Sequence, residues 1–396
     1  MRPFGSLLPW PDAFRRAMDS AFPVERSEEI PLASACERIL AEAVVAPHDV
    51  PAFDRAAVDG YALRGAEAAR EGAALRCAGR ILAGGAPVAV GPGGCVEIAT
   101  GAPLPPGADA VVMVEETARS GDRVSLAKAV RPGQNVTRAG SDLARGEVAL
   151  REGAVLGPAQ VGAAAACGRS SLRVWARPRA AVFTTGDEVV EPGRPCAGGQ
   201  VYNVNTFTLG ALLESCGCEV ARGGVVGDSF AALDAALGAH LDLDLLVVSG
   251  GTSVGEKDLL PDFLRTHGEV VFHGTAVKPG KPTLIGRIGR CLFVGVPGYP
   301  TSGLTIALRL VAPLARRIGR RPSPRAVVVR ARLAREVRSP RDKTHFLPVR
   351  VADGVAESAM KESGAITSLA HADGMIVIPE GIDRLAAGAE VEVELL

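Results

Sequence analysis

The residues best suited to chemistry lie in LLVVSGGTSVGEKD (245–258), where an apolar run ends in glycines and hydroxyl residues. Gly250, Gly251 and Gly255 let the backbone turn tightly and approach a ligand closely. Hydroxyl donors are added by Ser249, Thr252 and Ser253. The N–H groups of such a loop bind phosphate or another oxyanion, although no Walker A motif is present. The alternative is a plain strand-to-helix turn in which Asp258 only caps the next helix.

Two lysines flank a rigid turn in the segment AVKPGKPTLIG (276–286). Lys278 and Lys281 stand on either side of a Pro-Gly pair, so both cations can face one oxyanion. Turns also carry solvated lysines that bind nothing. The segment therefore predicts an oxyanion site chiefly because the glycine and acidic loops accompany it.

Carboxylates recur in short, glycine-rich settings at Asp59, Asp142, Asp187, Glu188, Asp228 and Asp258. Acids beside a phosphate site commonly hold Mg²⁺, because hard cations prefer oxygen ligands. The competing explanation is turn chemistry, since Asp-Gly pairs favour turns. The six histidines lie in unrelated contexts, which makes a histidine-based triad a poor hypothesis. We interpret His345 and His371 as surface or packing residues.

The elements that must position these groups lie in residues 178–320, where short apolar strands alternate with helices. The expected strands are 180–184, 220–226, 245–249, 270–272 and 292–296. The expected helices are 205–216, 230–240, 259–266 and 301–318. Asn205 is the expected N-cap of the first helix and Gly217 its C-terminal stop, and Pro313 interrupts the last helix. This alternation predicts a parallel sheet covered on both faces. Its ligands bind beyond the carboxyl ends of the strands, at loops 184–193, 227–228, 249–258 and 297–302.

The remaining segments have other characters. Residues 8–44 contain two helix-like stretches, and 46–142 are rich in Gly and Pro with short Val-rich runs, which indicates a β-rich domain. Residues 158–167 have Pro near the start and Gly168 just past the end, which suits a short helix. The last segment, 325–396, returns to β character, with strict alternation in EVEVELL.

The totals exclude some classes of protein. With 396 residues we expect several domains, and 44 basic residues balance 44 acidic ones. This balance gives no reason to expect nucleic acid or an anionic membrane as the main partner. The eight cysteines are scattered without a CxxC motif, which fits buried thiols in a reducing, cytoplasmic setting. The N-terminus lacks the uninterrupted apolar core of a signal peptide.

Taken together and in order, the motifs resemble the MoeA family of molybdopterin molybdenumtransferases, which is related to the gephyrin E domain. The matching segments in the first half are PAFDRAAVDGYALRG (51–65), IATGAPLPPGADAVVMVEE (98–116), RAGSDLARGEVAL (138–150) and TTGDEVVEPG (184–193). Those in the second half are Gly227-Asp228, VVSGGTSVGEKD (247–258), AVKPGKPTLIG (276–286), VGVPGYPTS (294–302) and SGAITSLAHADGMIVIPEG (363–381). The resemblance covers nearly the whole chain.

The resemblance implies a multidomain α/β plus β architecture. Residues 1–45 with 143–177 would form an elongated dimerisation domain, and 46–142 a β-rich domain. Residues 178–324 would form a doubly wound, mostly parallel, adenylyltransferase-like α/β domain that binds molybdopterin, and 325–396 a small β barrel. The family works as a homodimer, with its active site between the α/β domain of one subunit and the β domain of the other.

The implied reaction inserts molybdate into adenylylated molybdopterin and releases AMP, with Mg²⁺ or a similar divalent cation. The positions that match the family's catalytic residues are Asp59, Thr100, Asp142, Glu188, Asp228 and Asp258. Of these, Glu188, Asp228 and Asp258 are the expected metal ligands. The expected substrate-binding residues are Ser249, Gly250, Gly251, Thr252, Ser253, Lys278, Lys281, Pro282, Ser302 and Ser368. Further expected partners are the molybdopterin adenylyltransferase and apo-molybdoenzymes.

Two residues depart from the family pattern. Tyr299 stands where PGNP would have Asn, and Pro348 in HFLPVR (345–350) stands where relatives often have Arg. Both fall near the expected oxyanion site, which leaves open a tungstate-preferring version of the reaction. The alternative functions are adenylylation of molybdopterin and a non-catalytic scaffold or metal-sensing module.

Overall fold

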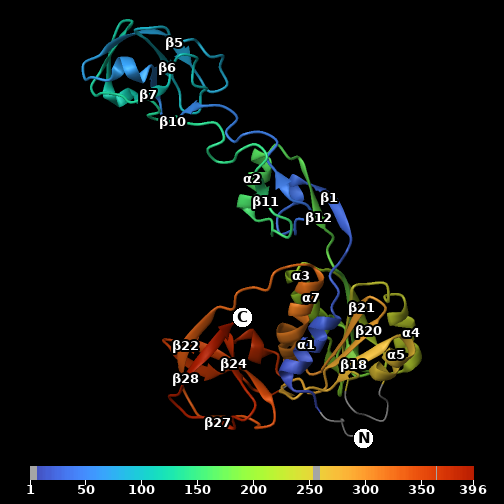
Figure 1. Ribbon diagram of the computed structural model, residues 1–396. Helices are drawn as coiled ribbons and strands as arrows, with labels where there is room; N and C mark the ends of the chain where they lie inside the picture. Colours follow the sequence, from blue (N-terminus) through green and yellow to red (C-terminus); the bar gives the residue numbers. More distant parts are fainter. Residues whose placement is uncertain (1–6, 253–258, 363) are drawn as a thin grey trace. The chain divides into compact units, whose positions relative to one another are not determined.

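A computed structural model describes residues 7–252, 259–362 and 364–396. The chain divides into two compact units, Met1–Glu28 with Trp175–Leu396, and Glu29–Val174 (Figure 1). The expected substrate residue Ser253 and the expected metal ligand Asp258 lie outside the described residues. Across the described ranges, no helix combines the length and the apolarity that crossing a membrane requires.

The larger unit is built on a six-stranded sheet in the order β16-β13-β17-β21-β20-β18. The bounds are Glu219–Val226 for β16, Arg179–Thr185 for β13, Leu245–Ser249 for β17, Cys291–Val296 for β21, Leu284–Ile288 for β20 and Glu269–His273 for β18. The first four strands are parallel, whereas β20 pairs antiparallel with both of its neighbours. The sheet is therefore mixed, whereas the alternation of strands and helices predicted a parallel sheet and the resemblance a mostly parallel one. Strand β20, which follows Pro282, was not among the expected strands.

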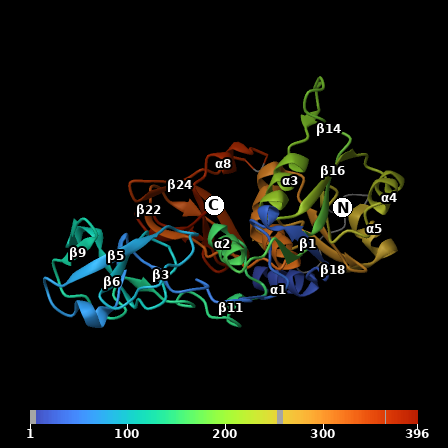
Figure 2. The same cartoon turned by 90° about the horizontal axis from the view of Figure 1, so that it is seen from above.

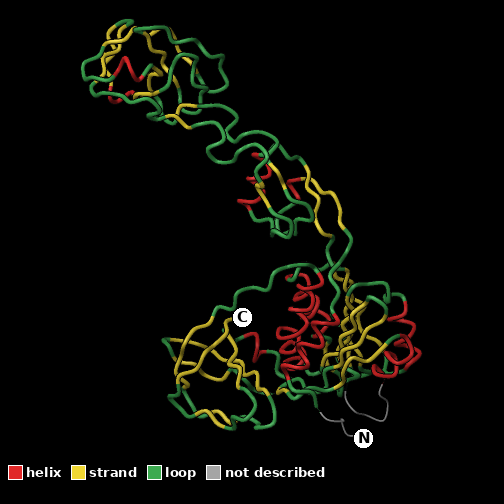
Figure 3. The backbone as a smooth tube through the Cα atoms, viewed as in Figure 1, coloured by secondary structure: helices red, strands yellow, loops and turns green. Residues whose placement is uncertain are grey.

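Helices cover both faces of this sheet, as expected (Figure 3). Along β17, Leu245 and Val247 belong to one buried cluster, and Leu246 and Val248 to the other, because successive side chains of a strand point to opposite faces. The helices packed on the first cluster are α1 (Trp10–Ser20), α3 (Asn205–Ser215), α6 (Pro300–Ile306) and α7 (Ala312–Ile318). Those packed on the second are α4 (Phe230–Gly238) and α5 (Leu259–His267).

Three local expectations need correction. The last long helix is interrupted one turn before Pro313, by a π-helical segment at Ala307–Val311. Asn205 is the first residue of α3 rather than its cap, and its side chain points elsewhere. The second helix-like stretch of the N-terminus forms strand β1 (Ser27–Pro31) and a single 3₁₀ turn. Helix α1 itself packs on the sheet, so it groups with the larger unit.

A closed five-stranded barrel follows near the C-terminus, in the order β24-β25-β22-β28-β26 with β26 returning to β24. Its strands are β22 (Val328–Leu333), β24 (Thr344–Ala352), β25 (Val355–Ser358), β26 (Gly374–Ile378) and β28 (Glu390–Leu395). Alternate residues such as Val391 and Val393 fill its interior. The two-residue strand β19 (Val277–Lys278) pairs with β24, which ties the lysine turn to the barrel.

The other unit contains the β-rich segment as a six-stranded sheet in the order β7-β4-β6-β5-β9-β8. Its strands are β4 (Gly60–Leu63), β5 (Ala74–Ile81), β6 (Gly94–Ile98), β7 (Ala110–Met113), β8 (Thr117–Ser120) and β9 (Arg123–Leu126). A smaller core joins β2 (Val44–Val45), β11 (Val148–Leu150) and the short helix α2 (Pro158–Ala166). Residues from before and after the β-rich segment thus meet in one core. The finer four-part division stays a prediction.

Candidate active site

Four loops meet at one edge of the mixed sheet because four neighbouring strands are parallel. β16, β13, β17 and β21 all end there, so the segments after Val226, Thr185, Ser249 and Val296 lie next to one another. Within the segment after Thr185, the β14–β15 pair (Val189–Val190 and Val201–Tyr202) extends away from the sheet (Figure 2). The expected ligand edge of the sheet is therefore present.

A pocket of about 1060 Å³ occupies this edge. Pockets for drug-sized ligands are on the order of 300–1,000 Å³, so this one has room for a nucleotide-sized molecule. Its lining brings together six of the expected site residues: Glu188, Asp228, Gly250, Gly251, Thr252 and Pro282. Ser249 is not among them, since it is fully buried and its hydroxyl contacts Asn205 and Pro297.

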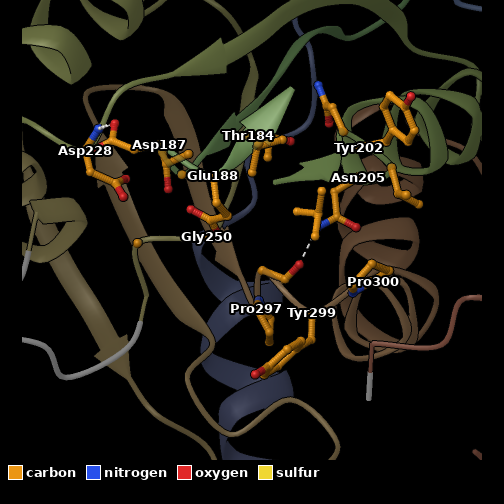
Figure 4. A pocket seen from close by; sticks show the side chains of 18 of the residues that line it. Thr184, Asp187, Glu188, Tyr202, Asn205, Asp228, Gly250, Pro297, Tyr299 and Pro300 are labelled. Carbon is orange, nitrogen blue, oxygen red and sulfur yellow. Dashed lines mark hydrogen bonds between the residues drawn. The ribbon is translucent and has the colours of Figure 1, made fainter. Parts of the chain in front are cut away.

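Three carboxylates line one side of the pocket (Figure 4). Asp187 and Glu188 follow β13, and Asp228 follows β16. The Asp228 N–H donates to Asp187 Oδ1 at 3.1 Å, which links the two loops. Within the described ranges, no three His, Cys, Asp or Glu side chains are arranged to hold a metal ion. The carboxylate oxygens of Glu188 and Asp228 are nonetheless the donors that Mg²⁺ prefers, so the two residues fit the expected cation as part of a ligand set.

The glycines after β17 are required by their surroundings. Gly250 has φ +90° and Gly251 has φ +61°, a region that other residues rarely adopt. A Cβ on Gly250 would lie 2.7 Å from both the carbonyl oxygen and the hydroxyl of Thr185. That buried hydroxyl has no hydrogen-bond partner in the described structure. The loop therefore packs directly on the end of β13, and only glycine fits there.

Asn205 joins the loops from the floor of the pocket. Its Nδ2 donates to Ser249 Oγ and to the Gly298 carbonyl, each at 2.7 Å. A backbone carbonyl only accepts, so these bonds fix which end of the amide faces the loops. From the sequence, Asn205 is expected only as a helix cap. Its two hydrogen-bond partners lie 44 and 93 residues further along the chain, so a local sequence pattern does not indicate this role.

Two tyrosines stand at the rim of the same pocket. Tyr299 is 67% exposed and Tyr202 is 47% exposed. The Tyr202 hydroxyl donates to the Arg194 carbonyl at 3.2 Å. In Figure 4 both rings lie apart from the carboxylates of Asp187 and Asp228. The pocket therefore has an acidic part, and its two tyrosines lie away from that part at separate places.

The expected oxyanion residues lie in the same unit but outside the pocket lining, Pro282 excepted. Lys278 and Lys281 are exposed on their turn, whereas Ser302 is buried in α6. Ser368, in the short helix α8 (Thr367–Ala370), is fully buried and accepts a hydrogen bond from the Lys361 N–H at 3.1 Å. The two helices are joined where Thr301 Oγ1 donates to the Ala365 carbonyl at 2.7 Å.

His345 lies directly beside Lys278, because β19 and β24 pair these two residues. It is 3% exposed, and burial together with the charge of Lys278 lowers the pKa of its imidazole to about 4. The ring is therefore neutral near pH 7. Its Nδ1 has no hydrogen-bond partner among the described residues. The interpretation of His345 as a packing residue is consistent with this burial, and Pro348 is buried in the same strand.

Asp59, Thr100 and Asp142 belong to the other unit. The N–H and the hydroxyl of Thr100 both donate to Asp59 Oδ1, at 2.7 and 3.0 Å. The backbone bond first, and the hydroxyl bond second, hold the pKa of the Asp59 carboxyl below its ordinary value of 3.8. Asp142 is also exposed, and its N–H donates to the Val50 carbonyl at 3.0 Å. Two of the three residues therefore form one anionic site.

Comparisons with known proteins agree with this geometry over the whole chain. Family models match in chain order: the MoeA N-terminal region (domain I and II) at residues 8–168, a probable molybdopterin binding domain at 181–317, and the MoeA C-terminal region (domain IV) at 330–396. A molybdopterin molybdenumtransferase of Haemophilus influenzae is 38% identical over 74% of this chain and 73% of its own. Molybdopterin molybdenumtransferase 2 of Mycobacterium tuberculosis is 34% identical over 92% and 94%.

Solved structures of MoeA proteins are also similar to this chain. A molybdopterin biosynthesis MoeA protein of Pyrococcus horikoshii superposes with a TM-score of 0.86 at 37% identity, covering 98% of this chain and 99% of that one. A second from the same organism gives 0.84 at 29% identity, covering 99% and 100%.

Proposed function

The chain belongs to the MoeA family, and from this premise we propose how it carries out its step in molybdenum cofactor biosynthesis. Relatives that match over most of their length are named molybdopterin molybdenumtransferase, so the chain is a transferase of that pathway. We propose that it inserts molybdate into adenylylated molybdopterin and releases AMP. The observation that carries the proposal is the pocket that gathers Glu188, Asp228, Gly250 and Pro282 at the ligand edge of the sheet.

The glycine loop supplies the phosphate-binding part of this proposal. Gly250 and Gly251 line the pocket and carry no side chain, so the backbone at these positions is open to a ligand. The N–H groups after a parallel strand bind phosphate oxygens, and the pyrophosphate of adenylylated molybdopterin offers such oxygens. We assign this loop to the phosphate groups that join the two halves of the substrate.

Glu188 and Asp228 would hold the expected divalent cation, together with Asp258. A bound Mg²⁺ neutralises charge on phosphate oxygens and on the leaving AMP. What the chain itself contributes is two carboxylates on separate loops, and the Asp228 N–H bond to Asp187 links these loops. The same carboxylates repel the phosphates when no cation is bound, so substrate binding is expected to require the cation.

The tetrahedral oxyanion substrate would bind at Lys278, Lys281 and Ser302. Two cations around a turn attract a doubly charged anion. The turn is anchored, since the Lys281 carbonyl accepts from the Thr275 N–H at 2.9 Å and Thr283 Oγ1 donates to the Gly280 carbonyl at 2.7 Å. Tyr299 and Pro348 leave the choice between molybdate and tungstate to experiment.

Asp59 and Thr100 would complete the site from a second subunit. The family resemblance supports a homodimer in which the β-rich domain of one chain meets the pocket of the other. An ionised Asp59 held by Thr100 suits a second contact to the cation or to the departing group. Location in the cytoplasm and association with an adenylyltransferase and with apo-molybdoenzymes belong to the same proposal.

The deciding experiment measures AMP release from adenylylated molybdopterin, with and without molybdate and with and without Mg²⁺. Release that requires both molybdate and the divalent cation supports the proposal. Adenylylated product formed from ATP and molybdopterin in the absence of molybdate would instead identify an adenylyltransferase. Absence of both reactions would favour a scaffold or a metal sensor. Running the assay with tungstate in place of molybdate determines the oxyanion preference.

A further inference from the structure

Tyr299 stands at the N-cap of α6 without capping the helix. Ser, Thr, Asp and Asn are preferred at this position because their short side chains accept a hydrogen bond from the first turn. A tyrosine ring cannot do this, and the start of α6 has no side-chain cap. Helix stability therefore does not explain the residue.

Burial does not explain it either. At 67%, the ring of Tyr299 is the most exposed of the large hydrophobic side chains in the described ranges. The chain has three tyrosines in all. Tyr61 is buried, whereas Tyr299 and Tyr202 both line the rim of the pocket. A chain with few aromatic residues thus places two of its three tyrosines at one site, with their rings open to solvent.

The backbone beneath this exposed ring is held at several points. Asn205 Nδ2 donates to the carbonyl of the preceding Gly298 at 2.7 Å. The Tyr299 carbonyl accepts from the Gly303 N–H at 2.8 Å. Pro300 restricts the conformation of the residue before it, and Tyr299 has the extended φ of −65° and ψ of 124° that this restriction favours. A ring on a fixed backbone binds a partner with less loss of conformational entropy.

We propose that Tyr299 is a stacking surface for a planar nitrogen heterocycle of the substrate, and this rests on the proposed function. The acidic part of the pocket, with Glu188 and Asp228, suits the phosphate and cation part of a nucleotide. The ring of Tyr299, which lies away from these acids, suits the ring system (Figure 4). Adenylylated molybdopterin carries two such rings, adenine and pterin, and both present a flat face that stacks on an aromatic side chain.

Three substitutions separate stacking from helix stability. Tyr299→Phe keeps the ring, Tyr299→Ala removes it, and Tyr299→Asn removes it while supplying a preferred N-cap. Phe207→Ala is the matched control, because Phe207 is also an aromatic residue of this unit, 48% exposed, outside the pocket lining. Thermal unfolding of Tyr299→Asn should occur at the wild-type temperature or above, which excludes loss of folding as the cause of weaker binding.

Binding is measured by isothermal titration of the full-length protein with two probes, AMP and pterin-6-carboxylate, each in the presence of Mg²⁺. At least one probe should bind Tyr299→Phe and Phe207→Ala within about twofold of wild type, and Tyr299→Ala and Tyr299→Asn about tenfold or more weakly. The probe whose binding weakens shows whether adenine or pterin stacks on Tyr299. Unchanged binding of both probes to the Ala and Asn variants, or binding of neither probe to the wild type, overturns the inference.

Turnover distinguishes this inference from the proposed function. If the wild type releases AMP with molybdate, Tyr299→Ala should raise KM for adenylylated molybdopterin about tenfold with kcat nearly unchanged, since the ring contributes uniform binding. An unchanged KM in that variant contradicts the stacking role alone. A wild type without molybdate-dependent release contradicts the proposed function first.

Discussion

The acids of the pocket and the acid of the β-rich sheet are positioned in opposite ways. Glu188 and Asp228 follow different parallel strands, so their closeness depends on the pairing of β13 with β16. Asp59 immediately precedes β4, and its partner Thr100 follows β6, which pairs with β4. The pocket acids therefore depend on the whole α/β unit, whereas the ionised state of Asp59 depends on one neighbouring residue. The first arrangement builds a cavity, and the second presents a single anion at the surface.

The largest expected effect comes from removing a pocket charge. Asp228→Asn keeps the shape of the side chain and removes its charge, so molybdate-dependent AMP release should fall by roughly 10²–10³. Asp242→Asn is the control, because its exposed carboxylate pairs with Arg179 at 3.3 Å and lies just before β17, at the opposite end of the strands. Equal activity of the two variants would show that the charge of Asp228 has no catalytic role.

Mixed dimers test whether the two regions serve one site. Asp59→Asn and Asp228→Asn should each be inactive, but random exchange of their subunits should restore about a quarter of wild-type AMP release, because half of the dimers then have one intact site of two. The exchanged mixture is assayed without fractionation, and separate tags on the two subunits measure how complete the exchange is. If mixing restores nothing while exchange is complete, the proposed contribution from a second subunit is wrong.

Glycine substitutions compare how crowded the two regions are. Gly101, next to Thr100, has φ +79° and open space where a Cβ would stand, so Gly101→Ala should cost only the roughly 1–2 kcal/mol of left-handed strain. Gly250→Ala has comparable strain at φ +90° and in addition a clash with the Thr185 backbone, so it should cost roughly 1–3 kcal/mol more. Urea denaturation of both variants measures the difference. Equal free energies of unfolding would mean that the glycine loop is not tightly packed on β13.

The smallest expected effect concerns the titration of Asp59. Thr100→Val removes the hydroxyl bond and keeps the larger contribution of the backbone N–H, so the pKa of Asp59 should rise only part of the way to 3.8. A folded-state pKa below 3.8 means that Asp59 stabilises the fold above that pH and loses this contribution as the pH falls through the folded value. In Thr100→Val the folded-state pKa lies closer to 3.8, so the pH range over which Asp59 changes the free energy of unfolding should become narrower.

Carboxyl NMR titration measures this change directly. Thr117→Val is a suitable control, since the Thr117 hydroxyl donates to the Val114 carbonyl at 2.8 Å rather than to an acid. A pKa of Asp59 that is the same in Thr100→Val and in wild type would assign the whole shift to the backbone bond.

Patterns of short range were predicted well from the sequence. The apolar runs gave β13, β17 and β21 within a residue or two, and Gly217 ends its helix with φ +89°, as expected. Strand β20 was missed because its residues follow the lysine turn directly and pair antiparallel with β21 through a tight hairpin. With only five residues, two of them Gly286 and Arg287, the strand has little periodicity to detect.

The sequence by itself determined the order of the motifs, the ligand edge of the sheet and the family, because these depend on residue types and spacing along the chain. Only the tertiary structure decided that Asn205 braces two loops instead of capping a helix, and that Tyr299 is a bare ring on a fixed backbone. The role of Asn205 depends on partners that are distant in the sequence. The role of Tyr299 depends on the exposure of its ring. A periodic pattern records which face of an element is apolar, but it does not record which loops from other strands meet it.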